Sequence, residues 1–121
     1  MNRWTLLQHE VFQDEALKTH YDFLVENGED CLTWKMLILP VLDGSPVEIN
    51  KHRNHRLIWL SRESQLLTKN RGFVKRVDNG TYKWLSNQSD KDNFSLTLSG
   101  SKINGIFKKS GCLCQLLSVE K

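Results

Sequence analysis

The chain has 121 residues, of which 39% are hydrophobic and 26% are charged. This length suits one domain with one core, and the composition excludes a disordered or fibrous chain. The net charge of +3 is a mild excess, compatible either with a nucleic-acid partner or with a plain solvated basic surface.

The first half of the chain contains short runs of two-residue alternation and β-rich composition, separated by turn residues. This pattern predicts an all-β (mainly β) fold, a compact β-barrel or flattened sandwich. Strands are expected at Arg3–Gln8, Tyr21–Glu26, Cys31–Leu39 and Arg56–Ser61. Between the first two strands lie good helix formers with acidic residues near their start, so we expect one short helix within Val11–Thr19.

The second half begins with the clearest local pattern in the chain. Two alternating arms run from Phe73 to Leu85 around Asn79-Gly80, a pair typical of type I′ turns, and predict a β-hairpin. Further strands are expected at Asn93–Leu98, Gly105–Lys109 and Cys112–Val119. No repeat or linker divides the sequence, so we expect one domain over residues 1–121.

Cysteine use and hydropathy indicate the compartment. The three cysteines are an odd number, and residues 1–10 contain no apolar stretch typical of a secretory signal. The longest strongly apolar stretch, Met36–Leu39, is far shorter than the roughly 20 residues that cross a bilayer as a helix. We therefore expect a cytoplasmic protein with reduced thiols and no membrane partner.

His20-Tyr21-Asp22, at the start of a predicted strand, is the most suggestive element for chemistry. Residues i and i+2 of a strand project from the same face, so His20 and Asp22 can meet one ligand. His9 can join them if the first two strands pair. Two imidazoles and a carboxylate suit Mn²⁺, Fe²⁺ or Zn²⁺, whereas a solvated or mutually hydrogen-bonded His–Asp pair is the alternative. The facial triad of iron-dependent oxygenases fits poorly, because that fold needs a longer chain.

A basic segment, Lys51–Arg56, precedes the fourth predicted strand and contains His55. A histidine here can donate to a phosphate oxygen or protonate a leaving group, because imidazole changes charge near neutral pH. A solvated basic loop is the alternative. Basic residues continue to cluster as far as Lys83, which is compatible with a polyanion partner such as nucleic acid and equally with a solvated basic face that has no partner.

Three blocks of sequence follow one another through most of the chain. The first is Arg3-Trp-Thr-Leu-Leu-Gln-His9, with Thr19-His-Tyr-Asp-Phe23 and Leu32-Thr-Trp34 after it; the second is His55-Arg-Leu-Ile-Trp-Leu60, with Arg71-Gly-Phe-Val-Lys-Arg76 and the segment to Trp84; the third is Leu98-Ser-Gly-Ser-Lys-Ile-Asn-Gly105. In this order they resemble the 3'-phosphoesterase domain of bacterial DNA ligase D, and more closely its short stand-alone relatives.

The resemblance implies a hydrolase that removes a 3'-terminal phosphate or ribonucleotide from a DNA end during repair. His9, His20 and Asp22 would bind a divalent metal, most often Mn²⁺ in this family, and His55 would contact the scissile phosphate as a catalytic residue. The residues implied to bind phosphate or nucleic acid are Arg53, Arg56, Trp59 and Arg71. A nucleic-acid 3' end is the implied partner, and a separate ligase or polymerase is a candidate partner.

Three departures from the family pattern keep a second function open. Leu24 stands where ligase-linked members have a phosphate-clamping Arg, and Trp59 stands where they have a Tyr. Ten residues separate His9 from His20, where the family usually has five, so we expect Val11–Thr19 to bulge out. The alternative is a non-catalytic end-binding or accessory module that retains the barrel but lacks the clamp.

Overall fold

The computed structural model describes residues 2–67, 72–86 and 90–119, and there the all-β prediction is confirmed. Its elements are β1 (Arg3–Gln13), β2 (Ala16–Asn27), β3 (Asp30–Met36), β4 (Val47–Glu48), β5 (Asn50–Arg56), the 3-10 helix η1 (Leu57–Ser61), β6 (Ser64–Leu66), β7 (Phe73–Ser86), β8 (Asn93–Gly100), β9 (Asn104–Ser110) and β10 (Leu113–Leu117). No helix in these ranges is long and apolar enough to cross a membrane. The three cysteines are free.

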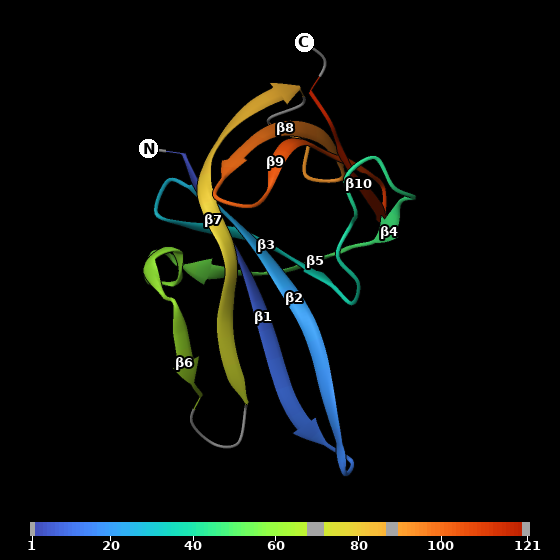
Figure 1. Cartoon of the computed structure of the whole chain (residues 1–121). Coiled ribbons are helices and arrows are strands. Elements are labelled where there is room, and N and C mark those ends of the chain that lie inside the picture. The colour runs from blue at the N-terminus through green and yellow to red at the C-terminus, as the bar shows by residue number, and fades with distance from the viewer. Residues whose placement is uncertain (1, 68–71, 87–89, 120–121) are drawn as a thin grey trace.

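The strands form one antiparallel sheet in the order β4-β10-β9-β8-β7-β1-β2-β3-β5, with β6 paired to β7. The sheet curls until β8–β10 lie across from β1–β3 (Figure 1). Its two outer strands, β4 and β5, are joined through the single residue Ile49, but within the described residues no ladder pairs them with each other. The sheet is therefore strongly coiled but open, and the closed-barrel version of the prediction is wrong.

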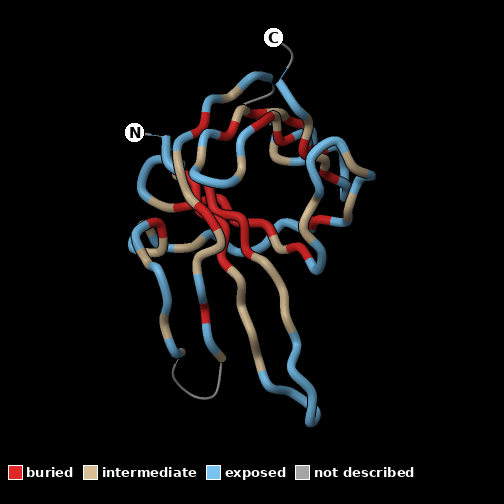
Figure 2. Tube along the Cα trace, in the orientation of Figure 1, coloured by how far each residue is buried: buried red, intermediate tan, exposed pale blue. Residues whose placement is uncertain are grey.

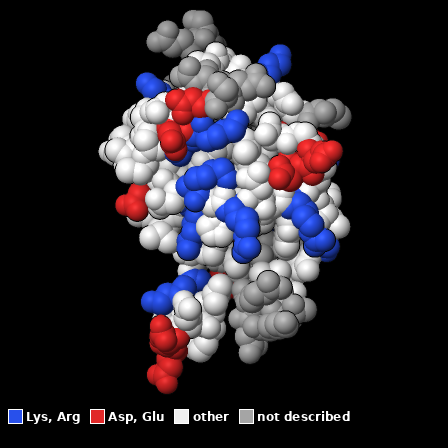
Figure 3. All heavy atoms as spheres, turned by 180° about the vertical axis from the view of Figure 1, so that it is seen from behind, with Lys and Arg blue, Asp and Glu red and all other residues white. Residues whose placement is uncertain are grey.

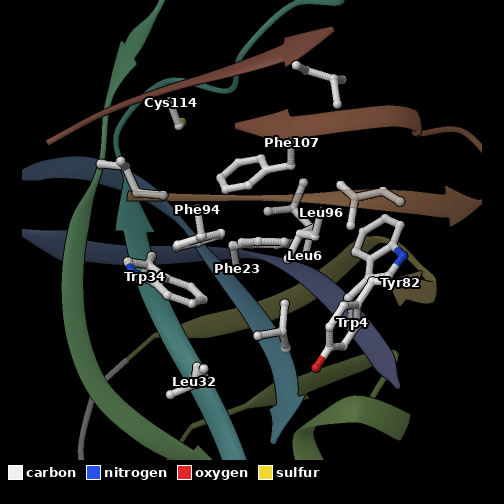
Figure 4. Close-up of a cluster of buried hydrophobic side chains, with 14 of the residues drawn as sticks. Trp4, Leu6, Phe23, Leu32, Trp34, Tyr82, Phe94, Leu96, Phe107 and Cys114 are labelled. Atoms are coloured by element: carbon white, nitrogen blue, oxygen red, sulfur yellow. The ribbon is translucent and has the colours of Figure 1, made fainter. Parts of the chain in front are cut away.

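The larger core fills the inside of this curl. Phe23 of β2 packs on Phe107 of β9 with ring centroids 4.7 Å apart, and Trp34 of β3 packs on Phe94 of β8 at 5.2 Å (Figure 4). Each such aromatic pair contributes about 0.5–1.5 kcal/mol beyond the burial of its area. Buried residues concentrate in this body, whereas the far arms of β1, β2 and β6 are mostly partly buried or exposed (Figure 2).

The predicted hairpin around Asn79-Gly80 is wrong, because β7 runs straight through both residues. This strand pairs with β1 along most of its length and with β8 from Gly80 onward. Glycine is required here for close approach rather than for a turn, since a Cβ at Gly80 would lie 1.7 Å from the carbonyl oxygen of Ser99. Pairing on both sides of β7 outweighs the local turn preference of the dipeptide.

The predicted short helix within Val11–Thr19 is also wrong, as is the predicted bulge. β1 continues to Gln13, β2 begins at Ala16, and the two strands form a hairpin closed by Asp14 and Glu15. Both turn residues have positive φ, 53° and 62°, as a two-residue type I′ turn requires. A nine-residue segment is too short to be a stable helix by itself, so strand pairing carried outward from the core decides its conformation.

The segment predicted as a strand at Arg56–Ser61 instead forms η1, and the strand before it is β5. Leu57 and Leu60, three residues apart, point the same way in a 3-10 helix. They complete a second, smaller cluster with four sheet residues, Leu7, Leu24, Cys31 and Val74. This cluster lies on the face of β1–β2 that is turned away from the larger core, and it underlies the site described below.

A buried carboxylate fixes the chain where β7 passes from β1 to β8. Asp78, 4% exposed, accepts backbone N–H groups from Ser101 (3.2 Å), Lys102 (2.9 Å) and Ile103 (2.7 Å). Burial alone would raise the pKa of this carboxyl group, but backbone donors outweigh it, and the pKa of Asp78 lies below its ordinary value. The carboxylate therefore ties the loop after β8 to the middle of β7.

We expect Asp78→Asn to lower the free energy of unfolding by roughly 2–3 kcal/mol, because an amide cannot accept these N–H groups on both oxygens. The contribution of Asp78 is present above the ordinary carboxyl pKa and is lost as pH falls through the depressed native value. Urea unfolding at neutral pH and at pH ~3 checks both points. Glu29→Gln, an exposed control outside these contacts, should change stability by less than about 0.5 kcal/mol. Equal losses in the two variants would contradict the assignment.

We expect Glu15→Gly to stabilise the β1–β2 hairpin by about 0.5–1 kcal/mol. The substitution relieves left-handed strain of about 1–2 kcal/mol, less the entropy cost of glycine. Slower hydrogen exchange of the backbone amides in residues 10–19 is the measurement. Gln13→Gly, two residues earlier and within the strand, should instead speed exchange; faster exchange in both variants would rule out the turn geometry.

Candidate metal centre

The pairing of β1 with β2 brings two histidines together. His9 lies directly opposite His20, and Leu7 lies opposite Asp22, so all four side chains share one face of the sheet. Nδ1 of His9 is 3.2 Å from Nε2 of His20, and that nitrogen is 3.4 Å from a carboxylate oxygen of Asp22. One ligand atom from each of His9, His20 and Asp22 lies within 4.8 Å of the other two.

This donor set fits a divalent cation. Two ligands at about 2.1 Å from one ion, at angles of about 90–110°, are separated by roughly 3.0–3.4 Å. The His9–His20 separation of 3.2 Å and the His20–Asp22 separation of 3.4 Å both fall in this range. His20 and Asp22 are mostly buried, with side chains 19% and 11% exposed. Bringing two imidazoles and a carboxylate this close, away from bulk water, is more favourable with a cation between them. Three protein ligands leave positions for solvent and a substrate oxygen.

His55 reaches the same site from a different part of the chain. It lies on β5, and with His9, Asp22 and Trp59 it lines a small cavity of ≈ 60 Å³ between the sheet and the η1–β6 segment. Its Nδ1 lies 3.0 Å from the carbonyl oxygen of Arg53, which assigns the proton to Nδ1. The ring also packs edge-on against Trp59, with centroids 6.4 Å apart. Nε2 of His55 is then the nitrogen left for chemistry.

The arginines expected beside His55 do not line this cavity. Arg53 and Arg56 are both exposed, and neither is among the cavity residues. Arg71 lies outside the described residues. Of the four residues expected to bind phosphate or nucleic acid, the structure brings only Trp59 to the cavity.

Leu24 belongs to the core. It is fully buried in the smaller cluster, between Leu7 of β1 and Cys31 of β3, on the same face as His20 and Asp22. A guanidinium at this position would have to displace the packing beneath η1. The apolar residue is therefore consistent with its surroundings, and anion binding must come from another strand.

Two further residues lie on this face: Lys35, which was missed in the sequence, and His52, which the sequence indicated only as a histidine of the basic segment Lys51–Arg56. Lys35 on β3 lies opposite Asp22, and His52 on β5 lies opposite Thr33, so both project from the site face. Burial lowers the pKa of His52, and the nearby carboxylate of Asp22 acts in the opposite direction. All four histidines of the chain thus lie on one sheet face. Only the register of β3 and β5 could have revealed this.

A larger cavity, ≈ 240 Å³, opens on the other side of the sheet. Its lining residues, which include Trp4, Phe23 and Leu116, contain no titratable side chain. It offers no group for acid–base or metal chemistry. The smaller cavity is therefore the candidate site.

No protein-family model matches the sequence, and a search among curated proteins finds no match either.

We expect the protein to bind one Mn²⁺ and His20→Ala to weaken that binding by at least about 100-fold, because the central ligand of the three is removed. Titration calorimetry, or the loss of the free-Mn²⁺ electron-paramagnetic-resonance signal, measures this. His55→Ala is the matched control, since its imidazole lies in the cavity but outside the three-ligand group, and it should leave Mn²⁺ affinity within about threefold. Unchanged affinity in His20→Ala would remove the metal centre.

Proposed function

We propose that this protein is a metal-dependent phosphoesterase that removes a 3'-phosphate or 3'-ribonucleotide from nucleic-acid ends in DNA end processing, as the resemblance to the ligase D domain implied. The observation that carries the proposal is that His9, Asp22 and His55, from three different strands, line one cavity. Two of the proposed cation ligands and the proposed proton-transfer group thus border the same small volume.

The cavity's own residues support hydrolysis of a terminal phosphate. A bound divalent cation, Mn²⁺ in this proposal, supplies charge neutralisation at a phosphoryl oxygen and activation of water. His9, His20 and Asp22 hold that cation. His55, oriented by the bond from its Nδ1–H to the Arg53 carbonyl, presents an unprotonated Nε2, which would take a proton from the attacking water and pass it to the departing oxygen.

The size of the cavity favours the end of a chain over its middle. A volume of ≈ 60 Å³ is far below the ~300 Å³ of pockets that enclose a drug-sized ligand. It suits a phosphate group and is too small for a nucleoside. The remainder of a substrate would lie outside, against the surface of the sheet.

A specific observation also favours the second candidate function, a non-catalytic end-binding or accessory module. The cavity is lined by no Arg or Lys among the described residues, and Leu24 is buried apolar packing. Charge on the non-bridging oxygens is then balanced by the cation and histidines alone. The two functions share a ligand, the 3' end, and differ in turnover.

Partners and compartment follow from the same proposal. Lys and Arg side chains gather across the middle of the face turned away from the viewer in Figure 1, with acidic side chains mostly around them (Figure 3). This distribution supports a nucleic-acid partner. A separate ligase or polymerase would use the processed end. The free cysteines support a reducing, cytoplasmic setting.

We expect Mn²⁺-dependent release of phosphate from a 3'-phosphorylated primer-template. His55→Ala should lower kcat/KM by about 10²–10⁴ while Mn²⁺ affinity is kept, because it removes proton transfer rather than a ligand. His20→Ala should lose both. Lys108→Gln, on β9, is the control and should retain activity.

The outcomes separate the two functions. Selective binding of 3'-phosphorylated DNA without turnover would favour the accessory module. Equal binding of DNA with and without the terminal phosphate, together with no turnover, would overturn both.

A further inference from the structure

Two basic side chains lie beside the candidate site on the β3–β5 side. Lys35 lies opposite Asp22 across the β2–β3 ladder, a position that puts Cβ atoms about 4.5–5.5 Å apart. It is partly buried, and the described residues show no ion pair for its ammonium group within 4.0 Å. Its backbone position next to Asp22, on the same face of the sheet, puts a long basic side chain within reach of an anion bound at the site.

His52 extends this basic surface by one strand. It lies opposite Thr33, two residues from Lys35 along β3, and its ring centroid is 6.3 Å from that of His55. Adjacent strands are about 4.8 Å apart, so β5 lies about two such spacings, roughly 10 Å, from the strand that holds Asp22.

On the β7 and η1 sides, the basic side chains near the site already have contacts. Arg76 on β7 lies opposite Leu7, but its guanidinium is 3.5 Å from the carboxylate of Glu63. Arg62 lies over the ring of Trp59 at 5.9 Å, on the η1 segment rather than on the sheet. On the site face of the described sheet, Lys35 is thus a partly buried basic side chain without an ion pair, whereas Lys18 on β2, two residues from His20, is exposed to solvent.

We infer that Lys35 and His52 hold a second anionic group of the substrate, the phosphodiester that precedes the terminal phosphate. This inference rests on the proposed function and specifies its substrate class: a nucleic-acid strand with at least one internal phosphodiester, rather than a nucleoside monophosphate. Lys35 supplies the charge and His52 a hydrogen bond. The phosphate binding that Leu24 cannot provide thus comes from the neighbouring strands.

The test measures binding in Mn²⁺ for two probes, a short 3'-phosphorylated oligothymidylate and thymidine 3'-monophosphate, in a His55→Ala background that keeps Mn²⁺ binding and slows release of the terminal phosphate. The oligonucleotide should bind more tightly. Lys35→Gln should lower its affinity about tenfold, should reduce the slope of log affinity against log salt by about 0.7, and should leave the monophosphate unchanged. His52→Gln should act in the same direction with a smaller effect. Lys83→Gln, the same charge change at the far end of β7, is the control, and circular dichroism checks folding of each variant.

Three results would overturn the inference: equal affinity for both probes, an equal loss for both in Lys35→Gln, or a loss of salt dependence in Arg62→Gln but not in Lys35→Gln. The last would put the strand on the η1 side. Failure of this inference is distinguishable from failure of the proposed function. Phosphate release without dependence on strand length would remove only the inference, and length-dependent binding without any phosphate release would remove only catalysis.

Discussion

The register of the β1–β2 hairpin is the constraint on which the rest of this structure depends. Ten residues separate His9 from His20, and they divide into four paired positions on each strand and a two-residue turn, so the histidines face each other. A slip of one residue would move one whole strand's side chains to the opposite face. His9 would then leave the site, and Leu7 would leave the smaller cluster. The positive φ of Asp14 and Glu15 is the local strain that this register carries.

The two faces of β1 and β2 have different roles because different elements pack against them. One face, with Trp4, Leu6 and Phe23, is covered by β8–β10 and forms the larger core. Among the described residues, the other is covered by η1 and by Leu67, which pack over Leu7 and Leu24. Where that cover ends, the sheet leaves half-buried positions that polar side chains can occupy. The candidate metal centre lies at this boundary, dry enough to strengthen electrostatic interactions and open enough to admit a small anion.

β7 and β5 each connect the larger core to the candidate site. β7 pairs with β1 near the site and with β8 beside the core, and Asp78 fixes the change of neighbour by accepting backbone N–H groups from the loop after β8. β5 continues from β4 through Ile49, which is 1% exposed, so that the core anchors the strand carrying His52 and His55. His52 and His55, which lie far from His9, His20 and Asp22 in the sequence, are thus held in place by the larger core through Ile49.

The sequence by itself determined the strands whose side chains alternate over a core, such as Arg3–Gln8 and Asn93–Leu98, and it placed His20 and Asp22 on one face, because both follow from the two-residue period of a strand. It failed where the deciding interaction is distant: Val11–Thr19 has helix formers, Asn79-Gly80 has turn formers, and hydrogen bonds to neighbouring strands outweigh each preference. Leu24 and the absence of Arg53 and Arg56 from the cavity depend on what packs above the sheet, which no local pattern encodes. The convergence of Lys35 and His52 on Asp22 was decided only by tertiary structure, because it requires the registers of three strands to be fixed together, and each register is set by the core that the strands share.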